Sequence, residues 1–256
     1  MELREIFNRE EESYDRYRPG YPAEVFAAIR AYGHLMPGDL AVEIGPGTGL
    51  ATGPVLDLGC RVTAVELGDR LAAFLRRKYP TQRLQVVQGD FMNWTGEEPA
   101  ALVYSATAFH WLPAPESYQK VFDALRPGGT VAIFRNHPYP ARMEDESNRA
   151  NERVYQKYRP RAACPPEFSA ADCAPTLDAL REAGFRDVEA RLFHRVRRLT
   201  TEQYIGLLGT YSDHRALPGP LRQAFEAEMA RELDAIGGEI RIYDTIDLCL
   251  ARRPEL

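Results

Sequence analysis

The sequence has few of the residues that build disulfide scaffolds or metal centres. Its 4 cysteines are widely scattered, and none belongs to a CxxC pair. Neither Cys164 nor Cys173 has a histidine nearby at the spacing of zinc ligands, and the 5 histidines fall in separate segments. We therefore expect reduced thiols and no metal site.

Long apolar runs are also absent. No run approaches the roughly 20 residues that a membrane-spanning helix needs. The first residues, MELRE, are charged, whereas a secretory signal has an apolar centre. The sequence thus predicts a soluble, cytoplasmic protein with no membrane partner.

Charge of one sign is not concentrated over the chain. The formal net charge is -5 and Lys and Arg are spread throughout, so we expect no nucleic-acid partner and either a monomer or a homodimer. One local basic cluster lies around a predicted strand, and we interpret it as the solvated face of a strand near the sheet edge. It consists of Arg191, Arg195, Arg197 and Arg198.

What the chain does contain is an alternation of strand-like and helix-like segments. Apolar runs of strand length occupy residues 40–44, 61–66, 84–88, 100–105 and 130–135. Helix-like segments occupy residues 23–32, 50–58, 70–79 and 118–125. This alternation predicts parallel βαβ units in an α/β fold. Further elements are predicted at residues 176–183 (helix), 188–197 (strand), 201–210 and 220–236 (helices) and 240–250 (strand).

A glycine-rich loop follows the first predicted strand, with glycines at the alternate positions Gly45, Gly47 and Gly49. Glycines between a strand and a helix let the backbone approach a ligand that a Cβ would block. Glu66 ends the next strand, about 20 positions further on, where an acidic residue can hold both ribose hydroxyls. The pattern predicts a nucleoside cofactor. Leu50 stands where a dinucleotide-binding G-x-G-x-x-G motif has its third glycine, which counts against a pyrophosphate.

Four successive motifs resemble those of class I S-adenosylmethionine-dependent methyltransferases of the small-molecule, type 11-like group. They are EIGPGTG at residues 43–49, Glu66, GDF at residues 89–91 and LRPGG at residues 125–129. They follow the predicted strands in the family's order and cover residues 40–135. The resemblance implies S-adenosylmethionine as the cofactor. It also implies a Rossmann-like, doubly wound sheet of seven strands, mostly parallel, with the last strand antiparallel.

The resemblance also implies roles for individual residues in holding the cofactor. Gly45, Gly47 and Gly49 would pass under its methionine portion. Glu66 would hold the ribose hydroxyls, with Leu67 beside the adenine. Asp90 would accept a hydrogen bond from the adenine amino group, Phe91 would lie against the ring, and the backbone near Ser105 would meet the methionine amine. By itself, Asp90 before Phe91 is equally a turn residue or a helix cap.

The N-terminal arm, residues 1–22, is rich in Tyr and Arg and resembles a segment that many small-molecule members fold over the cofactor. Arg18 can pair with a carboxylate through a charge-assisted fork. Tyr17 is predicted to close the cofactor pocket, and Tyr14 to contact the acceptor. The alternative is an aromatic staple that only holds the arm on the domain.

A further candidate segment, Phe109-His110-Trp111, follows the fourth predicted strand, at the edge where open α/β sheets bind ligands. Methyl transfer requires alignment and removal of a proton from the acceptor. His110 is the candidate general base because its ordinary pKa lies near neutrality. Phe109 and Trp111 are predicted to wall the acceptor pocket. Alternatively, the segment packs on the next helix and the imidazole is only hydrogen-bonded.

The remaining segments are interpreted as parts of one methyltransferase domain spanning residues 1–256. Residues 136–175 are too long for a plain connection and are predicted to form a lid; residues 200–236 would form a helical cap. Residues 211–215 either reach the substrate or form a solvated turn. The predicted function is methyl transfer to a small molecule in an enclosed pocket. The alternatives are a non-catalytic module that binds S-adenosylmethionine and, less favoured, a nicotinamide-dependent oxidoreductase.

Overall fold

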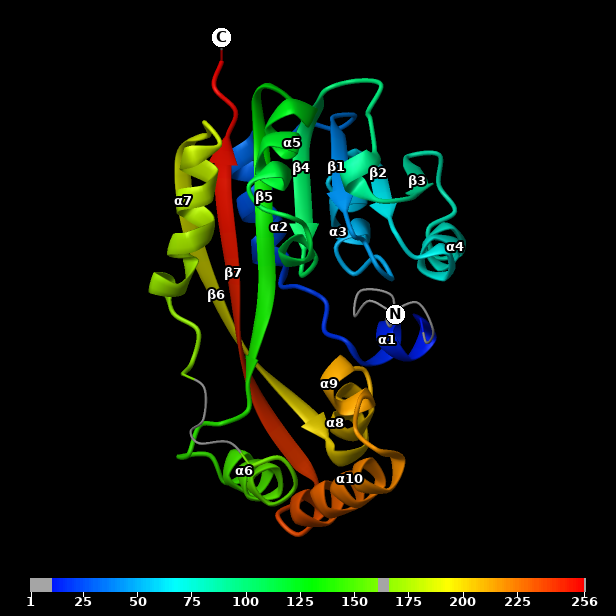
Figure 1. Cartoon of the computed structure of the whole chain (residues 1–256), viewed down its shortest axis with the longest axis vertical. Coiled ribbons are helices and arrows are strands. Elements are labelled where there is room, and N and C mark those ends of the chain that lie inside the picture. The colour runs from blue at the N-terminus through cyan, green and yellow to red at the C-terminus, as the bar shows by residue number, and fades with distance from the viewer. Residues whose placement is uncertain (1–10, 161–165, 256) are drawn as a thin grey trace.

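A single seven-stranded sheet runs through the computed structural model, which describes residues 11–160 and 166–255 (Figure 1). The strand order is β3-β2-β1-β4-β5-β7-β6. Neighbouring strands from β3 to β5 are parallel, and β7 is antiparallel to both of its neighbours. The prediction of a mostly parallel seven-stranded sheet with an antiparallel last strand is confirmed. The strands are β1 (Leu40–Ile44), β2 (Arg61–Glu66), β3 (Leu84–Gln88), β4 (Ala100–Ala106), β5 (Leu125–Tyr139), β6 (Arg186–Thr200) and β7 (Glu239–Arg252).

Helices cover both faces of the sheet. One core contains the apolar sides of α2, α3 and α4, and the other contains those of α5 and α7. The α-helices are α1 (Glu11–Tyr17), α2 (Ala23–Gly33), α3 (Thr52–Asp57), α4 (Asp69–Lys78), α5 (Glu116–Ala124), α6 (Glu146–Tyr158), α7 (Ala174–Glu182), α8 (Thr201–Leu208), α9 (Ser212–Arg215) and α10 (Gly219–Asp234). Short 3₁₀ turns are η2 (Phe91–Asn93), η3 (Phe109–Trp111) and η4 (Ala170–Cys173).

The last three strands in the chain are longer than the sequence predicted. Strand β5 extends on both sides of the predicted residues 130–135, and β6 and β7 likewise exceed their predicted bounds. Residues 136–139, predicted as the start of the lid, pair instead with residues 243–246 of β7. Their polar and proline-containing sequence is typical of a loop, and only the partner strand makes them part of the sheet.

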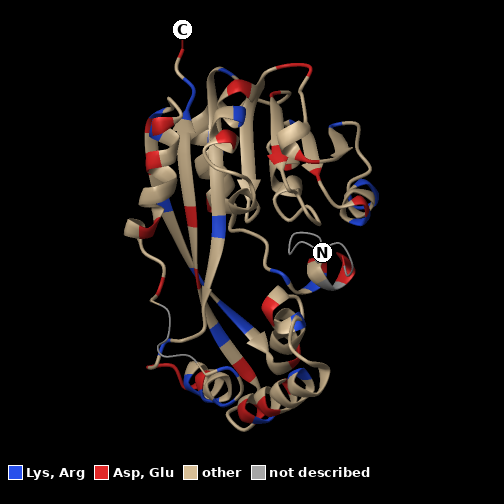
Figure 2. Cartoon of the chain, in the orientation of Figure 1, with Lys and Arg blue, Asp and Glu red and all other residues tan. Residues whose placement is uncertain are grey.

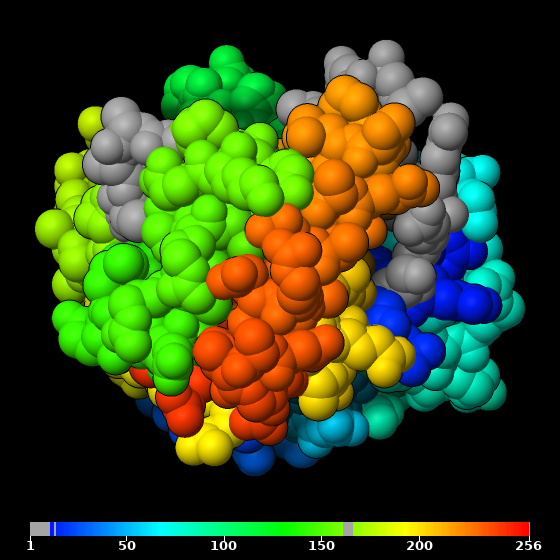
Figure 3. All heavy atoms as spheres, turned by 90° about the horizontal axis from the view of Figure 1, so that it is seen from below, coloured from blue at the N-terminus to red at the C-terminus, as the bar shows by residue number. Residues whose placement is uncertain are grey.

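The extended ends of these strands carry a third core at the far end of the molecule from β1–β4. Helices α6, α8 and α10 pack there on Ile240 and Ile242 of β7. Viewed from below, the green α6 and the orange-red α10 lie side by side (Figure 3). We call α6, α8, α9 and α10 the cap helices. The helix of the predicted lid thus packs against the helices of the predicted cap segment.

Charges of both signs are mixed along the chain (Figure 2). The basic cluster does lie on an edge strand, since β6 ends the sheet. However, Arg195 and Arg197 are not simply solvated, because both form ion pairs with Asp244, whose side chain is 0% exposed. A buried carboxylate requires such partners. Within the described residues, no helix is long and apolar enough to span a membrane.

Candidate active site

A cavity of about 340 Å³ opens between β1 and β4, where the order of the strands in the sheet reverses. Open α/β sheets bind ligands at this point, beyond the carboxyl ends of the strands. The glycine loop, the end of β2, η3 and the N-terminal arm all contribute to its wall. Ten of the residues predicted as site residues line the cavity: Tyr14, Arg18, Gly45, Gly47, Glu66, Leu67, Asp90, Phe91, His110 and Trp111.

The three glycines of the loop all have positive φ, but the space around them differs. A Cβ at Gly45 would lie 2.6 Å from that of Ala108, and one at Gly47 would meet nothing within 4 Å. A Cβ at Gly49 would lie 2.5 Å from Leu75 Cδ1 on α4. Gly47 therefore leaves room on the cavity side, whereas Gly49, which does not line the cavity, allows α4 to pack closely.

The carboxylate of Glu66 is hydrogen-bonded to the glycine loop. Its Oε2 accepts a hydrogen bond of 2.9 Å from the Gly47 N–H, and its Oε1 accepts one of 2.8 Å from the Gly68 N–H. Burial raises the pKa of Glu66, and these two backbone donors oppose the rise. A carboxylate has about four acceptor positions, so acceptor capacity is left on the cavity side for a pair of ribose hydroxyls.

A second acidic side chain, Glu43 on β1, is fully buried beside the loop. Its Oε2 accepts hydrogen bonds from Thr52 Oγ1 (2.5 Å) and Tyr104 OH (2.9 Å), while its Oε1 has no hydrogen-bond partner in the part of the chain that the structure describes. Burial raises the pKa of Glu43 to about 7. The folded protein therefore holds this carboxyl protonated at a pH where the unfolded chain has ionised it.

We predict that Glu43 makes the protein less stable as the pH rises. A carboxyl whose folded pKa lies above its unfolded value stabilises the fold fully in acid, and this contribution is lost between the two pKa values. Glu43→Gln should remove the effect. Between about pH 5 and about pH 8, the free energy of unfolding of the wild type should fall by about 2 kcal/mol relative to that of Glu43→Gln. Denaturant titrations across that range test this, with the exposed Glu182→Gln as the control; a pH-independent difference contradicts it.

Residues of the predicted adenine side lie together at the end of β3. The Asp90 carboxylate accepts a hydrogen bond of 2.9 Å from the Met92 N–H and caps η2, so the helix-cap interpretation is borne out. Capping does not exclude a ligand contact, since Asp90 also lines the cavity. Phe91 is buried and stacked on Trp94, while Leu67 is half exposed at the rim.

Three further predicted site residues point elsewhere. Tyr17 packs against α8, where a Cβ at Gly206 would lie 2.5 Å from its ring. Ser105 is buried, and its hydroxyl donates a 3.0 Å hydrogen bond to the Ile44 carbonyl. Phe109 is a core residue in edge contact with Tyr118. None of the three lines the cavity, so Phe109 supports the segment rather than walling the pocket.

His110 and Trp111 do face the cavity, from η3. Burial lowers the pKa of His110, and the positive charge of Arg135 lowers it further. The imidazole is therefore neutral at physiological pH and has a nitrogen lone pair that can accept a proton. Trp111 is 41% exposed and lies at the rim.

The N-terminal arm covers the cavity through α1 and the residues after it. Arg18 lies over the rings of Tyr14 (5.0 Å) and Tyr211 (4.4 Å), and donates a hydrogen bond to the Thr210 carbonyl. On the other side, Lys78 of α4 pairs with Asp15 of α1. Residues 1–10 of the predicted arm lie outside the described residues.

Several cavity residues were not predicted. Tyr21 donates to or accepts from Thr107 Oγ1 at 2.6 Å, and Thr107 has an unusual φ of 59°. No local signal in the sequence identifies a threonine in that conformation.

Asn136 could have been found, because it follows the predicted strand 130–135 at the ligand-binding edge of the sheet. Of residues 211–215, Tyr211 reaches the cavity, but His214 is buried against Tyr155.

Polar atoms without partners occur on the cavity wall. Arg18 Nε, Thr48 Oγ1 and Asn136 Oδ1 are buried and make no hydrogen bond with any described residue. Leaving a buried polar group unpaired costs roughly 1–3 kcal/mol. One donor, one carbonyl acceptor and one hydroxyl thus face a space that a polar ligand can fill.

The sheet order and the position of the cavity define a class I methyltransferase fold. Residues 42–133 match a family described as a methyltransferase domain. Residues 42–133 are therefore a methyltransferase domain of the class I, S-adenosylmethionine-dependent type, as the motifs predicted, and S-adenosylmethionine is the cofactor of that family.

Individual relatives differ in the acceptors that their names give. A ribosomal RNA small subunit methyltransferase A from Thermosynechococcus vestitus is 44% identical over 69 residues, which are 27% of this chain and 26% of that protein. A solved structure assigned as a type II methyltransferase from Anaeromyxobacter dehalogenans has a TM-score of 0.67 and 23% identity, and the match covers 94% of this chain and 100% of that chain. A phosphoethanolamine N-methyltransferase 2 from Haemonchus contortus has a TM-score of 0.58 and 17% identity over 100% of this chain and 61% of that chain. The structural matches show a shared fold, and the first relative is matched over about a quarter of its length.

Proposed function

We propose that this protein transfers a methyl group from S-adenosylmethionine to a small-molecule acceptor held in the cavity. The main support for this proposal is that Gly47 and Glu66 line the same cavity of about 340 Å³ as His110 and Trp111. Cavities of roughly this size hold small ligands. A donor side and an acceptor side therefore share one partly enclosed pocket.

The donor side fits the cofactor of the family. When bound, S-adenosylmethionine supplies a methyl group on a positively charged sulfur. Glu66 would hold the ribose hydroxyls, and the space over Gly47 would accommodate the backbone-facing part of the ligand. Arg18 Nε, buried and unpaired, would donate to the ligand carboxylate. Asp90 and Leu67 would border the adenine. The backbone around the cofactor would be supported by packing at Gly45, Gly49, Ser105 and Tyr17.

On the acceptor side, His110 would remove the proton that the acceptor loses on methylation. Its lowered pKa keeps it neutral and ready to act as a base. Asn136 Oδ1 would accept a hydrogen bond that orients the acceptor. Its amide is held in place because Nδ2 donates to Asp244 at 3.2 Å. Trp111 and Tyr14 would form the apolar walls.

Three observations support a small acceptor over a nucleic acid. The arm and Tyr211 cover the cavity. Charges of both signs are mixed on the elements around it, whereas nucleic-acid binding needs a basic surface (Figure 2). The loop after β4 reads Ala106-Thr107-Ala108-Phe109, without the Asn-Pro-Pro-aromatic motif of adenine and glutamine amino-methylation.

The test is transfer of a labelled methyl group from S-adenosylmethionine. The protein is incubated with a metabolite extract and, separately, with ribosomal RNA. We expect label in the small-molecule fraction alone, and strongly reduced transfer by Glu66→Ala, with the exposed Glu182→Ala retaining full transfer. Label in RNA would contradict the acceptor class. Stabilisation by the cofactor against heat without any transfer would indicate a non-catalytic binding module.

A further inference from the structure

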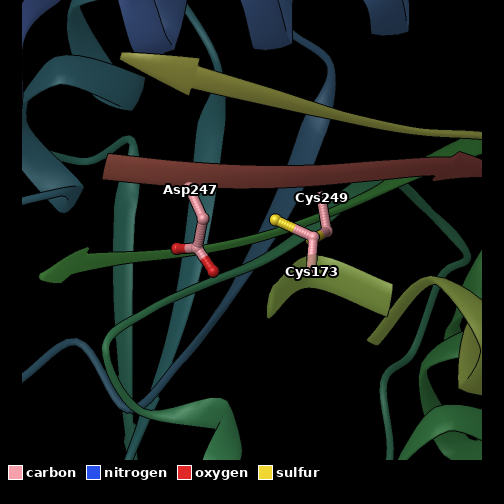
Figure 4. Close-up of side chains that lie close together, drawn as sticks. All are labelled: Cys173, Asp247 and Cys249. Atoms are coloured by element: carbon pink, nitrogen blue, oxygen red, sulfur yellow. The ribbon is translucent and has the colours of Figure 1, made fainter. Parts of the chain in front are cut away.

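Three buried side chains meet outside the candidate active site, between η4 and β7 (Figure 4). They are Cys173, at the end of η4, and Asp247 and Cys249 of β7. One ligand atom of each, the two Sγ atoms and a carboxylate oxygen, lies within 4.8 Å of the others. The exposed fractions are 1%, 8% and 1%, and none of the three lines the cavity.

The fold brings these groups together although they are far apart in the sequence. Asp247 and Cys249 are two positions apart on one strand, so their side chains project from the same face of the sheet. Cys173 reaches that face because η4 packs on β6 and β7. The carboxylate is fixed in direction, since Asp247 Oδ1 accepts a 2.6 Å hydrogen bond from the Arg135 N–H.

A histidine borders this group through Asp247, although its ring nitrogens are not among the ligand atoms that all lie within 4.8 Å of one another. His137 Nε2 lies 3.4 Å from Asp247 Oδ1, yet this nitrogen is buried and makes no hydrogen bond within residues 11–160 and 166–255. Its ring is stacked on Phe168 with centroids 3.6 Å apart. Ligand atoms about 2.1 Å from a tetrahedral zinc ion are themselves about 3.4 Å apart. The nitrogen and oxygen thus have the spacing of two ligands of one ion, and the nitrogen has an unfilled bonding capacity.

The charges of the site also suit a divalent cation. Two thiolates and one carboxylate carry three negative charges, which a divalent ion offsets in large part. Without an ion, burial keeps both thiols neutral by raising their pKa values. Sulfur with nitrogen and oxygen donors favours zinc over magnesium or calcium.

We propose that Cys173, Asp247, Cys249 and His137 form a structural binding site for a thiophilic divalent cation of the zinc type. The site would fasten η4, at the end of the predicted lid segment, to β7 and β5 of the sheet. With His137 drawn in as the fourth ligand, the coordination shell would be closed, which is typical of structural rather than catalytic zinc. The site is separate from the methyl-transfer chemistry and does not depend on it.

The test uses the reduced full chain, stripped of metal and titrated with zinc against a chromophoric chelator. We expect one tightly bound ion per chain. Cys173→Ser or Cys249→Ser should weaken binding by more than the ~10–100-fold that loss of an outer-shell partner costs. Cys60→Ser, which changes a buried cysteine in another core, should bind as the wild type does. Zinc should raise the melting temperature of the wild type and of Cys60→Ser only.

Cobalt(II) provides a second readout that needs no variant. One equivalent should give a thiolate-to-cobalt charge-transfer absorption with the d–d bands of a tetrahedral site, and His137→Ala should alter those bands. No thiolate band in the wild type would overturn the proposal. So would stoichiometric binding that survives both serine variants, or a Cys173–Cys249 disulfide as the resting state of the protein purified without added metal or reductant.

Discussion

Replacing His110 with alanine should lower the rate of methyl transfer by about 10²- to 10⁴-fold, the usual contribution of a general base. Cofactor affinity should change little, because His110 has no proposed contact with the cofactor. The reason for the large effect is that the neutral imidazole provides a proton acceptor on the cavity wall. Single-turnover rates and calorimetric cofactor binding measure the two effects separately.

The pH dependence distinguishes a base from a wall residue. Because the His110 pKa lies below its ordinary value of 6.5, activity should rise with pH through a midpoint below that value and stay high at neutral pH. His110→Asn keeps a polar side chain but loses the base, so this rise should disappear. His34→Asn, at an exposed position with the φ of 49° that asparagine tolerates, is the control. Full activity of His110→Asn would show that the acceptor loses no proton or is already ionised.

Replacing Glu66 with alanine should weaken S-adenosylmethionine binding by about 100-fold or more. Hydrogen bonds to a charged group contribute roughly 1.5–3 kcal/mol each, and the ribose offers two hydroxyls. Calorimetry measures the loss, with circular dichroism to show that the fold persists. The exposed Glu182→Ala on α7 should bind as the wild type does.

An altered ligand separates a ribose contact from a structural role of Glu66. The carboxylate also holds the Gly47 and Gly68 N–H groups, so the variant could lose affinity through a distorted loop alone. A cofactor analogue without the 2′-hydroxyl should bind the wild type more weakly than the natural cofactor does. The variant should bind the two ligands alike, as a double-mutant cycle requires for a direct contact. If the variant still discriminates between them, Glu66 does not hold that hydroxyl.

The cofactor half of the fold could be predicted because its signals are local. The bounds of β1, β2 and β3 coincide with apolar runs of the sequence, since these short strands are specified by their own burial. The glycine loop and Glu66 lie close in sequence to the strands that position them. Most cofactor-side predictions therefore reached the cavity wall, apart from Gly49, Ser105 and Tyr17.

The acceptor half could not be predicted to the same degree because it depends on distant partners. Asn136 belongs to β5 only because β7, more than a hundred residues later, pairs with it. Phe109 and Trp111 are near neighbours of similar character, and only packing of η3 decides that one enters the core and the other the cavity. The neighbours of Cys173 could not be predicted for the same reason, because Asp247 and Cys249 belong to the last strand.

The unbroken length of β5 and β7 limits how the pocket can open. Their hydrogen-bonded ladder runs without a break from Thr130 and Arg252 to Tyr139 and Tyr243, and the ends beyond carry the cap helices. A continuous ladder offers no hinge along this stretch, so we expect the cap helices to move little relative to the sheet. We therefore expect the width of the cavity to change little when ligands bind. We expect ligand exchange to require displacement of α1, whose contacts with α4 and α8 include Lys78–Asp15 and Tyr17 on Gly206.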